Sequence, residues 1–404
     1  MKAFTLSHAN ILQIIEGLLT AQDPARRSLV TDQMRDVVWS LEMTLGEVGV
    51  GGDDETLSAV GQRVEEFFNM VPGSLDGLSS SNALQNCAEK VQLHIENSFL
   101  TLNFRPASHG DDTALCAHST DSLYQAAAAA ASLLHGRRRL VSMISPHSLI
   151  GFVIGVLTPA LMDIETIDAR RLSPDLLQKA LAFGDVIVAT PSLWAYLIRE
   201  SITAPDNTMG VSFGEPMSVQ LASDMRRNGI GVLRELYGST QSGLVAWRDT
   251  PSDDFVLFEH WHRGSGPESL ETQIVRHCSN GNNIAVPSMD RLSWKTDRTF
   301  TLGGRIDGAM QIGSVNIFPD NIAATLKQHE AVADCNVRIS ATELGTKRLI
   351  ADVILLSRKL PDETVAREVD NWARTHLAIH ERPHIINLYV SENVEFRKPN
   401  ETVN

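Results

Sequence analysis

Hydrophobic residues recur at helical spacing in the first part of the chain, at residues 11–19 and again at residues 60–68. Apolar positions three and four residues apart place one face of a helix against a core. A Gly-Gly-Asp-Asp break at residues 51–54 separates the two patterns, and a serine-rich stretch at residues 78–82 follows them. The pattern predicts a helical N-terminal region over residues 1–95.

From about residue 99 the pattern changes to short apolar runs that alternate with helical segments. The runs are rich in β-branched residues, which favour strands. Strands are expected at residues 100–104, 140–144, 164–168, 186–189 and 232–236, and helices at residues 123–134, 149–161 and 174–183. This alternation predicts a mostly parallel sheet covered by helices on both faces, with ligands bound beyond the carboxyl ends of the strands.

The last part of the chain has a different order of elements. Helices are expected at residues 321–329 and 364–377, and strands at residues 332–339, 349–355 and 385–390. This order predicts a small α+β domain. The chain is therefore expected to be an α/β protein in which a helical region (1–95) and a core domain (96–305) precede a small α+β C-terminal domain (306–404).

Composition and charge exclude some classes of partner. The chain has 404 residues, of which 43% are apolar and 21% charged, so it can bury a large core. The net charge of −14 argues against a nucleic-acid or anionic-membrane partner, because phosphate contacts need clustered basic residues. The basic run at residues 137–139 is interpreted as a solvated helix end. Hydrophobic runs fall short of the ~20 residues that cross a bilayer, and the N-terminus lacks a signal-peptide pattern, so a cytoplasmic location is expected.

The cysteines and paired histidines do not indicate a metal site. The four cysteines have neither metal nor redox spacing and are expected to be reduced thiols. His260 and His262 lack a third ligand at suitable spacing, and alternation along a strand explains them better.

One stretch carries most of the candidate chemistry. A short apolar run ends in small hydroxyl and glycine residues, which let backbone N–H groups approach an anionic ligand closely. An ordinary turn after a strand would give the same pattern. The residues are Tyr237, Gly238, Ser239, Thr240 and Gln241.

This stretch resembles the adenine- and phosphate-contacting motif of the adenylate-forming superfamily, which includes acyl-CoA synthetases, aryl-acid ligases and adenylation domains. The usual pattern there is Tyr-Gly-Ser/Thr-Thr-Glu, so Gln241 replaces the acidic residue that helps to hold Mg²⁺. The resemblance covers about residues 95–400 and is strongest to compact bacterial aryl-acid ligases. It implies that residues 237–241 bind a nucleotide or substrate.

Other segments resemble the same superfamily. Residues 303–319 are similar to its hinge, which implies a mobile C-terminal domain and a ribose or phosphate contact from Arg305. Gly214 and Glu215 match a strand end that lines the adenine and acyl pockets, although Glu215 can also be interpreted as an exposed turn residue. Asp290 matches the ribose-binding aspartate, and its carboxylate could accept hydrogen bonds from two ribose hydroxyls. His147 matches a residue that borders the acyl pocket, although a lone histidine is more often structural.

The phosphate-binding features of the superfamily are altered. Residues 104–119 keep the framing of the glycine-rich phosphate loop, but Ala114 takes the place of its lysine, and Asp111 and Asp112 stand where phosphates would bind. Two charges about 4 Å apart interact by roughly 4 kcal/mol at an effective dielectric near 20, so these carboxylates oppose a triphosphate. The terminal Gly-Lys is also missing. Arg397 or Lys398 could replace that catalytic lysine in charge.

Three functional hypotheses follow from the resemblance. In the first, the chain transfers the acyl group of an acyl-adenylate or thioester to an amine or thiol in small-molecule (secondary-metabolite) biosynthesis. Residues 237–240 would then hold the AMP moiety, His147 would face the acyl carbonyl, and Asp111 and Asp112 would bind a cationic acceptor. The second hypothesis keeps ATP-dependent adenylation, with ATP and Mg²⁺, and ligation to CoA or an acyl carrier protein. The third is a non-catalytic protein that binds an acyl or nucleotide ligand or a partner enzyme.

Overall fold

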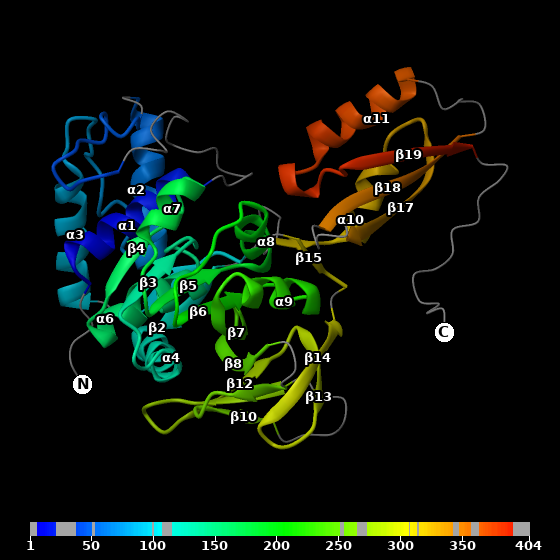
Figure 1. The fold of residues 1–404 in the computed structure, drawn as a ribbon. Coiled ribbons are helices and arrows are strands. Elements are labelled where there is room, and N and C mark those ends of the chain that lie inside the picture. The colour runs from blue at the N-terminus through cyan, green and yellow to red at the C-terminus, as the bar shows by residue number, and fades with distance from the viewer. Residues whose placement is uncertain are drawn as a thin grey trace. The chain divides into compact units, whose positions relative to one another are not determined.

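The computed structural model describes residues 6–21, 38–50, 53–98, 101–106, 115–250, 254–264, 273–306, 308–312, 315–341, 347–356 and 363–390. The chain divides into two compact units, Met1–Gly303 and Gly304–Asn404 (Figure 1). Each unit has its own apolar core. No helix in the described ranges is long and apolar enough to cross a membrane.

The first unit is built on a sheet of nine described strands in the order β13-β14-β9-β8-β7-β6-β5-β3-β4. The five strands at one end are parallel to one another, which confirms the mostly parallel sheet expected there. They are β3 (Arg139–Ser142), β4 (Glu165–Asp168), β5 (Asp185–Ala189), β6 (Thr208–Phe213) and β7 (Ile230–Ser239). The sheet continues with β8 (Gly243–Asp249), β9 (Phe255–Leu257), β14 (Thr299–Arg305) and β13 (Asp290–Trp294), and β8 runs antiparallel to β7.

Apolar side chains on both faces explain why this sheet is covered by helices. Val186 and Val188 of β5 belong to one buried cluster, whereas Ile187 and Ala189 belong to another. Successive strand residues point to opposite faces, so a run of apolar residues needs a cover on each side. The helical segments are α4 (Thr120–Leu133), α5 (Leu149–Phe152), a π-helix (Val153–Leu157), α6 (Thr158–Met162), α7 (Pro174–Ala180), α8 (Pro191–Arg199) and α9 (Val219–Arg227).

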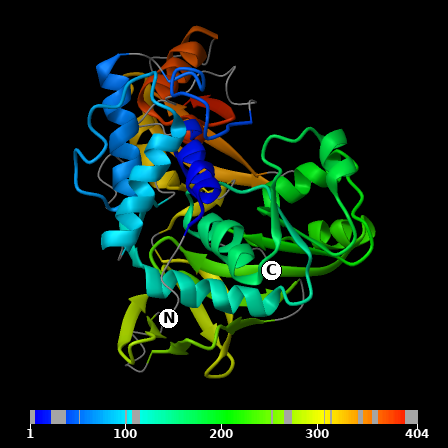
Figure 2. The same cartoon turned by 90° about the vertical axis from the view of Figure 1, so that its left-hand side faces the viewer.

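The predicted N-terminal helices are present and share the core of the sheet. They are α1 (His8–Thr20), α2 (Asp54–Phe68) and α3 (Leu84–Ser98), and they group together in Figures 1 and 2. Ser7 and Asp53 cap α1 and α2 by accepting backbone N–H bonds. Phe67 of α2 packs edge-to-face on Phe104 and Phe152, at 5.2 and 6.1 Å between ring centroids. The helices therefore belong to the same packed body as the sheet.

Two small sheets complete the first unit. The first pairs β1 (Thr101–Phe104) with β2 (Cys116–Ser119), antiparallel. The second contains β10 (Trp261–Arg263), β11 (Gln273–His277) and β12 (Asn283–Pro287), also antiparallel.

The second unit has the α+β order that the sequence predicts. Strand β18 pairs antiparallel with β17 and parallel with β19. The elements are β15 (Met310–Ile312), β16 (Val315–Ile317), α10 (Pro319–Leu326), β17 (Val332–Ala341), β18 (Lys347–Leu355), α11 (Glu363–His376), a 3-10 turn (Ile379–Glu381) and β19 (Ile385–Val390).

The interpretation of residues 137–139 as a solvated helix end is wrong for Arg139. This residue begins β3 and pairs with Asp185 at the start of the neighbouring strand, through two hydrogen bonds of 2.9 and 2.8 Å. Asp185 is 0% exposed and also accepts the N–H of Ala182 at 2.7 Å. A buried carboxylate needs such partners, so the sheet and not solvent holds Arg139.

Replacing Asp185 with alanine should lower the free energy of unfolding by about 3 kcal/mol, because it leaves the Arg139 guanidinium without its buried partner. Urea unfolding of the purified variant measures this loss. The control is Asp249→Ala, which removes the partner of Arg234 from another arginine–aspartate pair of the same sheet. Asp249 has 41% of its side chain exposed, so this control should lose less than about 1 kcal/mol. Equal losses would contradict the assignment.

Candidate functional site

The carboxyl ends of four parallel strands place the sequence-predicted site segments at one edge of the sheet. Strands β3, β5, β6 and β7 are neighbours in that order and run in the same direction. Gly214 follows β6 directly, and His147 lies five residues beyond the end of β3. Tyr237 lies two residues before the end of β7. Ligands of open α/β sheets bind at this kind of edge.

The Tyr237 loop is a tight hairpin between β7 and β8. Tyr237 pairs with Ala246 and Gly238 with Leu244, with an irregular register between the two pairs. Glycine is required at residue 238, because a Cβ there would lie 2.1 Å from the carbonyl oxygen of Gly243. Gly243 itself has a φ of 81°, which favours glycine.

The turn between the two strands is held by serine hydroxyls. The Ser239 and Ser242 hydroxyls lie 3.0 Å apart, and each accepts the backbone N–H of the other residue, at 3.0 and 3.1 Å. Thr240 is partly exposed, and Gln241 is exposed at the tip of the turn. The turn therefore has a fixed base and a polar, accessible tip.

Two of the sequence-predicted residues meet directly. The Tyr237 hydroxyl donates to Oδ2 of Asp290 at 2.9 Å and lies 3.0 Å from the Ser288 hydroxyl. The Tyr237 ring packs at 5.7 Å from each of the rings of Phe255 and Phe300. Sequence reasoning missed Ser288, whose hydroxyl accepts the N–H of Asp290 at 3.1 Å. The only local signal for it was its position two residues before the aspartate.

The alternative interpretation of Glu215 as an exposed turn residue is wrong. It is 7% exposed and accepts a hydrogen bond from the Ser192 hydroxyl of α8 at 3.1 Å. Gly214 before it has a φ of 92°, so the chain turns sharply at the end of β6. The carboxylate therefore faces into the protein at the strand end.

A second buried glutamate, which sequence reasoning also missed, fixes the same loop. Glu235 of β7 is 2% exposed and accepts the N–H of Met217 at 2.8 Å. Its other oxygen accepts from Arg248 and from the Thr250 hydroxyl, each at 2.7 Å. The sequence signal for it was a glutamate inside an apolar strand pattern. Glu235 ties the loop after β6 to β7 and β8.

His147 lies at the same edge but away from this group. The ends of β3 and β7 are three strand spacings, or about 14 Å, apart. A Cβ at Gly17 of α1 would lie 2.7 Å from its Nδ1, so the ring packs on that helix. Within the described residues its Nδ1 is buried and has no hydrogen-bond partner. Burial, with smaller effects from Arg170 and Arg63, lowers the pKa of His147 to about 4, so the ring is neutral at pH 7.

The other predicted residues fall in the second unit or outside the described residues. Arg305 ends β14 in the second unit. Asp111, Asp112, Arg397 and Lys398 lie outside the described residues. Among the residues that the structure describes, no group of three histidine, cysteine, aspartate or glutamate side chains could hold a metal ion.

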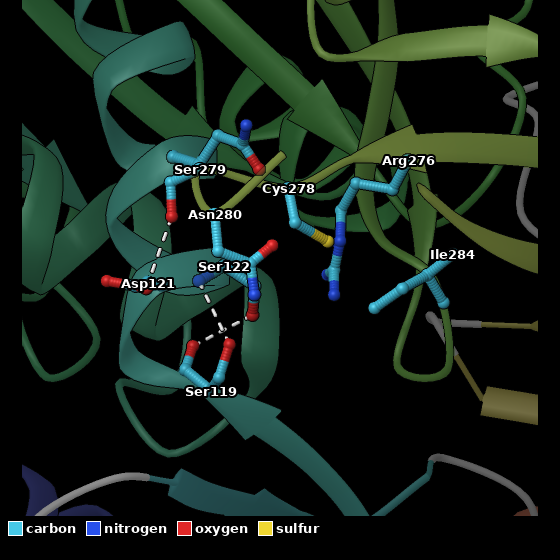
Figure 3. Close-up of a pocket in the computed structure, with 9 residues that line it drawn as sticks. Ser119, Asp121, Ser122, Arg276, Cys278, Ser279, Asn280 and Ile284 are labelled. Atoms are coloured by element: carbon cyan, nitrogen blue, oxygen red, sulfur yellow. Dashed lines mark hydrogen bonds between the residues drawn. The ribbon is translucent and has the colours of Figure 1, made fainter. Parts of the chain in front are cut away.

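A small cavity lies between the start of α4 and the β11–β12 hairpin (Figure 3). Its volume is about 100 Å³, well below the roughly 300–1,000 Å³ of a typical ligand pocket. It is lined by Ser119, Asp121, Ser122, Gln125, Arg276, Cys278, Ser279, Asn280 and Ile284. Figure 3 shows the Ser279 hydroxyl reaching Asp121, a hydrogen bond of 3.1 Å. The cavity is too small for a nucleotide.

Known proteins resemble this chain in sequence. No protein-family model matches it. The 4-coumarate–CoA ligase of Halorhodospira halophila is 34% identical over 266 residues, which are 66% of each chain. The 4-coumarate–CoA ligase of Rhodobacter capsulatus is 30% identical over 215 residues, 53% of this chain and 52% of that one. The matches thus span about half to two thirds of the length of these curated relatives.

Solved structures share the fold. The amide bond synthetase McbA from Marinactinospora thermotolerans has a TM-score of 0.54 and 16% identity, covering 72% of this chain and 65% of its own. The o-succinylbenzoate CoA synthetase from Bacillus subtilis has a TM-score of 0.52 and 15% identity, covering the same shares. The fold is that of two-domain ligases. Together with the sequence relatives, it shows that this chain belongs to the adenylate-forming superfamily.

The pKa of His147 gives a prediction for acid stability. The unfolded chain binds a proton at this ring near pH 6.5, the folded chain only near pH 4. Stability should therefore fall as the pH drops from 6.5 to 4, and His147→Gln should reduce that fall by about 2 kcal/mol after allowance for partial exposure. Urea unfolding at several pH values measures the slope. His135→Gln, at an exposed histidine of the same unit, is the control and should keep the wild-type slope. Identical slopes in all three proteins would refute the assignment.

Proposed function

We propose that this chain transfers the acyl group of an activated carboxylic acid to an amine or thiol, with the AMP moiety of an acyl-adenylate held by the Tyr237 loop. The contact that carries the proposal is the 2.9 Å hydrogen bond from Tyr237 to Asp290. It joins the two residues that the superfamily motif assigns to adenine and ribose.

The chemistry of these groups suits an adenosine. A carboxylate can accept hydrogen bonds from both ribose hydroxyls, and the Tyr237 hydroxyl orients that carboxylate. The partly exposed Tyr237 ring offers a flat apolar face to adenine. The small residues of the turn let N–H and hydroxyl groups approach a phosphate.

The proposed transfer balances without further reactants. The amine or thiol attacks the acyl carbonyl carbon, a C–N or C–S bond forms, and the bond from that carbon to the phosphate oxygen breaks. AMP leaves with the electron pair, and the proton of the nucleophile passes to solvent or to a leaving oxygen. His147 would border the acyl group as a neutral ring, because a pKa of about 4 makes it a weak base at pH 7.

The sequence supports a preactivated donor over ATP. Asp111, Asp112 and Ala114 replace the neutral and basic residues of a phosphate loop, and Gln241 replaces an acidic metal ligand. Each change weakens the phosphate–metal assembly, and all act in the same direction.

The second candidate is ATP-dependent ligation of a carboxylic acid to CoA. It is favoured by the 34% identity to a 4-coumarate–CoA ligase. It requires phosphates placed away from Asp111 and Asp112, or neutralised there by Mg²⁺.

Calorimetric titration with AMP, and separately with ATP and Mg²⁺, tests the nucleotide site. We expect AMP to bind in the micromolar range and ATP about tenfold or more weakly. Tyr237→Phe and Asp290→Asn should each weaken AMP binding about tenfold, because the first removes the hydroxyl that orients the ribose-facing carboxylate and the second removes the carboxylate itself. Tyr196→Phe makes the same change on α8 and should leave the affinity unchanged.

Product assays then separate the alternatives. An acyl-adenylate with an amine acceptor should yield an amide and AMP without ATP. Formation of pyrophosphate from ATP and acid would instead establish ligation. AMP binding without either product would identify a non-catalytic binding protein, and binding of neither nucleotide would overturn the proposed site.

The two loop carboxylates are proposed to hold a cationic acceptor. Asp111→Asn with Asp112→Asn should raise the KM of a diamine acceptor about tenfold and leave that of a neutral thiol acceptor unchanged, because only the diamine carries charge near them. Asp54→Asn with Glu55→Gln removes the same charge at the start of α2 and serves as control. An unchanged KM for the diamine in the loop variant would reject this role.

A further inference from the structure

His118 joins the candidate phosphate-loop segment to the Tyr237 loop. It lies in β2, is 6% exposed, and its Nε2 is 2.7 Å from the carbonyl oxygen of Thr240, 122 residues away in sequence. A carbonyl oxygen can only accept a hydrogen bond, so Nε2 carries the hydrogen and donates it.

Packing and strand pairing fix the position of the His118 ring. The ring packs edge-to-face on Phe104 of β1, at 5.8 Å between centroids, and Phe104 is fully buried. In the β1–β2 register His118 pairs with Leu102 and Cys116 with Phe104. Burial lowers the pKa of His118 further below neutrality, so one neutral form, with the hydrogen on Nε2, predominates at pH 7.

Strand β2 also belongs to the segment that resembles the phosphate loop. That segment, residues 104–119, starts at the last residue of β1 and ends at the last residue of β2. His118 therefore lies within this segment, on the strand that closes it. The bond to Thr240 connects β2 with the turn between β7 and β8.

Thr240 is the position in the turn where such a bond has most effect. The Ser239 and Ser242 hydroxyls fix the base of the turn from within. The peptide between Thr240 and Gln241 lies beyond that base, and its orientation sets the direction of the neighbouring N–H groups. A turn of small polar residues has little packing of its own, so an external bond removes much of its freedom.

A packing role alone does not explain a histidine here. An apolar side chain would fill the space against Phe104 without the cost of burying ring nitrogens. The bond to Thr240 offsets that cost, and it connects the ring to the Tyr237 loop.

We propose that His118 is a positioning residue, which fixes the Thr240 carbonyl so that the turn holds the phosphate of an adenylate. This inference rests on the proposed AMP site for its ligand, and on the His118–Thr240 bond for its geometry.

Comparing AMP with adenosine isolates the phosphate-facing effect. His118→Leu should weaken AMP binding about tenfold and adenosine binding less than about threefold, because Tyr237 and Asp290 still hold the nucleoside. His118→Gln keeps an N–H donor at a similar reach and should stay within about threefold of wild type for both ligands. Equal loss of both ligands, or no loss of AMP, in His118→Leu would overturn the proposal.

Amide hydrogen exchange tests the geometry whether or not AMP binds. In His118→Leu, the amides of residues 240–243 should exchange about tenfold faster than in wild type, while those of β5 and β6 keep their rates. His118→Gln should restore slow exchange. His118→Asn, too short to reach the carbonyl, replaces the leucine variant if that one fails to fold. Unchanged exchange in the turn would overturn the inference, whereas absence of AMP binding by wild type would overturn only the proposed function.

Discussion

The parallel pairing of β3, β5, β6 and β7 is the constraint on which the candidate site depends. It brings loops from four distant parts of the chain to one edge of the sheet. Strand β5 is buried at all its positions, and its alternate side chains belong to different apolar clusters. A shift of register by one residue would exchange these faces, so the register is strongly specified. The loops therefore start from fixed points although they contain few apolar residues.

Two carboxylates, the buried Glu235 and the half-buried Asp290, extend this order into the loops. Glu235 holds the N–H of Met217 after β6, and Asp290 accepts the hydroxyl of Tyr237 from a strand near the other end of the sheet. Each carboxylate accepts hydrogen bonds from another element, which for Glu235 is the condition for burying such a group. The same bonds that meet this condition also set the position of the candidate nucleotide-binding residues.

Local patterns predicted the elements, because apolar spacing is a property of neighbouring residues. The strands at residues 186–189 and 232–236 and the helix at residues 364–377 are confirmed. Partners that lie far apart in sequence left no such pattern. Three adjacent arginines therefore suggested solvent, although Arg139 pairs with the buried Asp185. The bond between Glu215 and Ser192 of α8 likewise joins residues far apart in sequence. His118 and Glu235 were missed for the same reason. The Tyr237–Asp290 pair was reached only through resemblance to a known motif.

The two halves of an adenylate site depend on the fold to different degrees. The Tyr237 ring packs on Phe255 and Phe300, so its loss would disturb the core. Residues of exposed loops can change without that cost, since surface loops tolerate substitution. Retention of the ring is therefore weak evidence for function, because phenylalanine would pack equally well. The hydroxyl and its bond to Asp290 have no such packing role. They are therefore the stronger support for the proposed adenosine site, whereas the altered sequence of residues 104–119 supports the proposal of a preactivated donor.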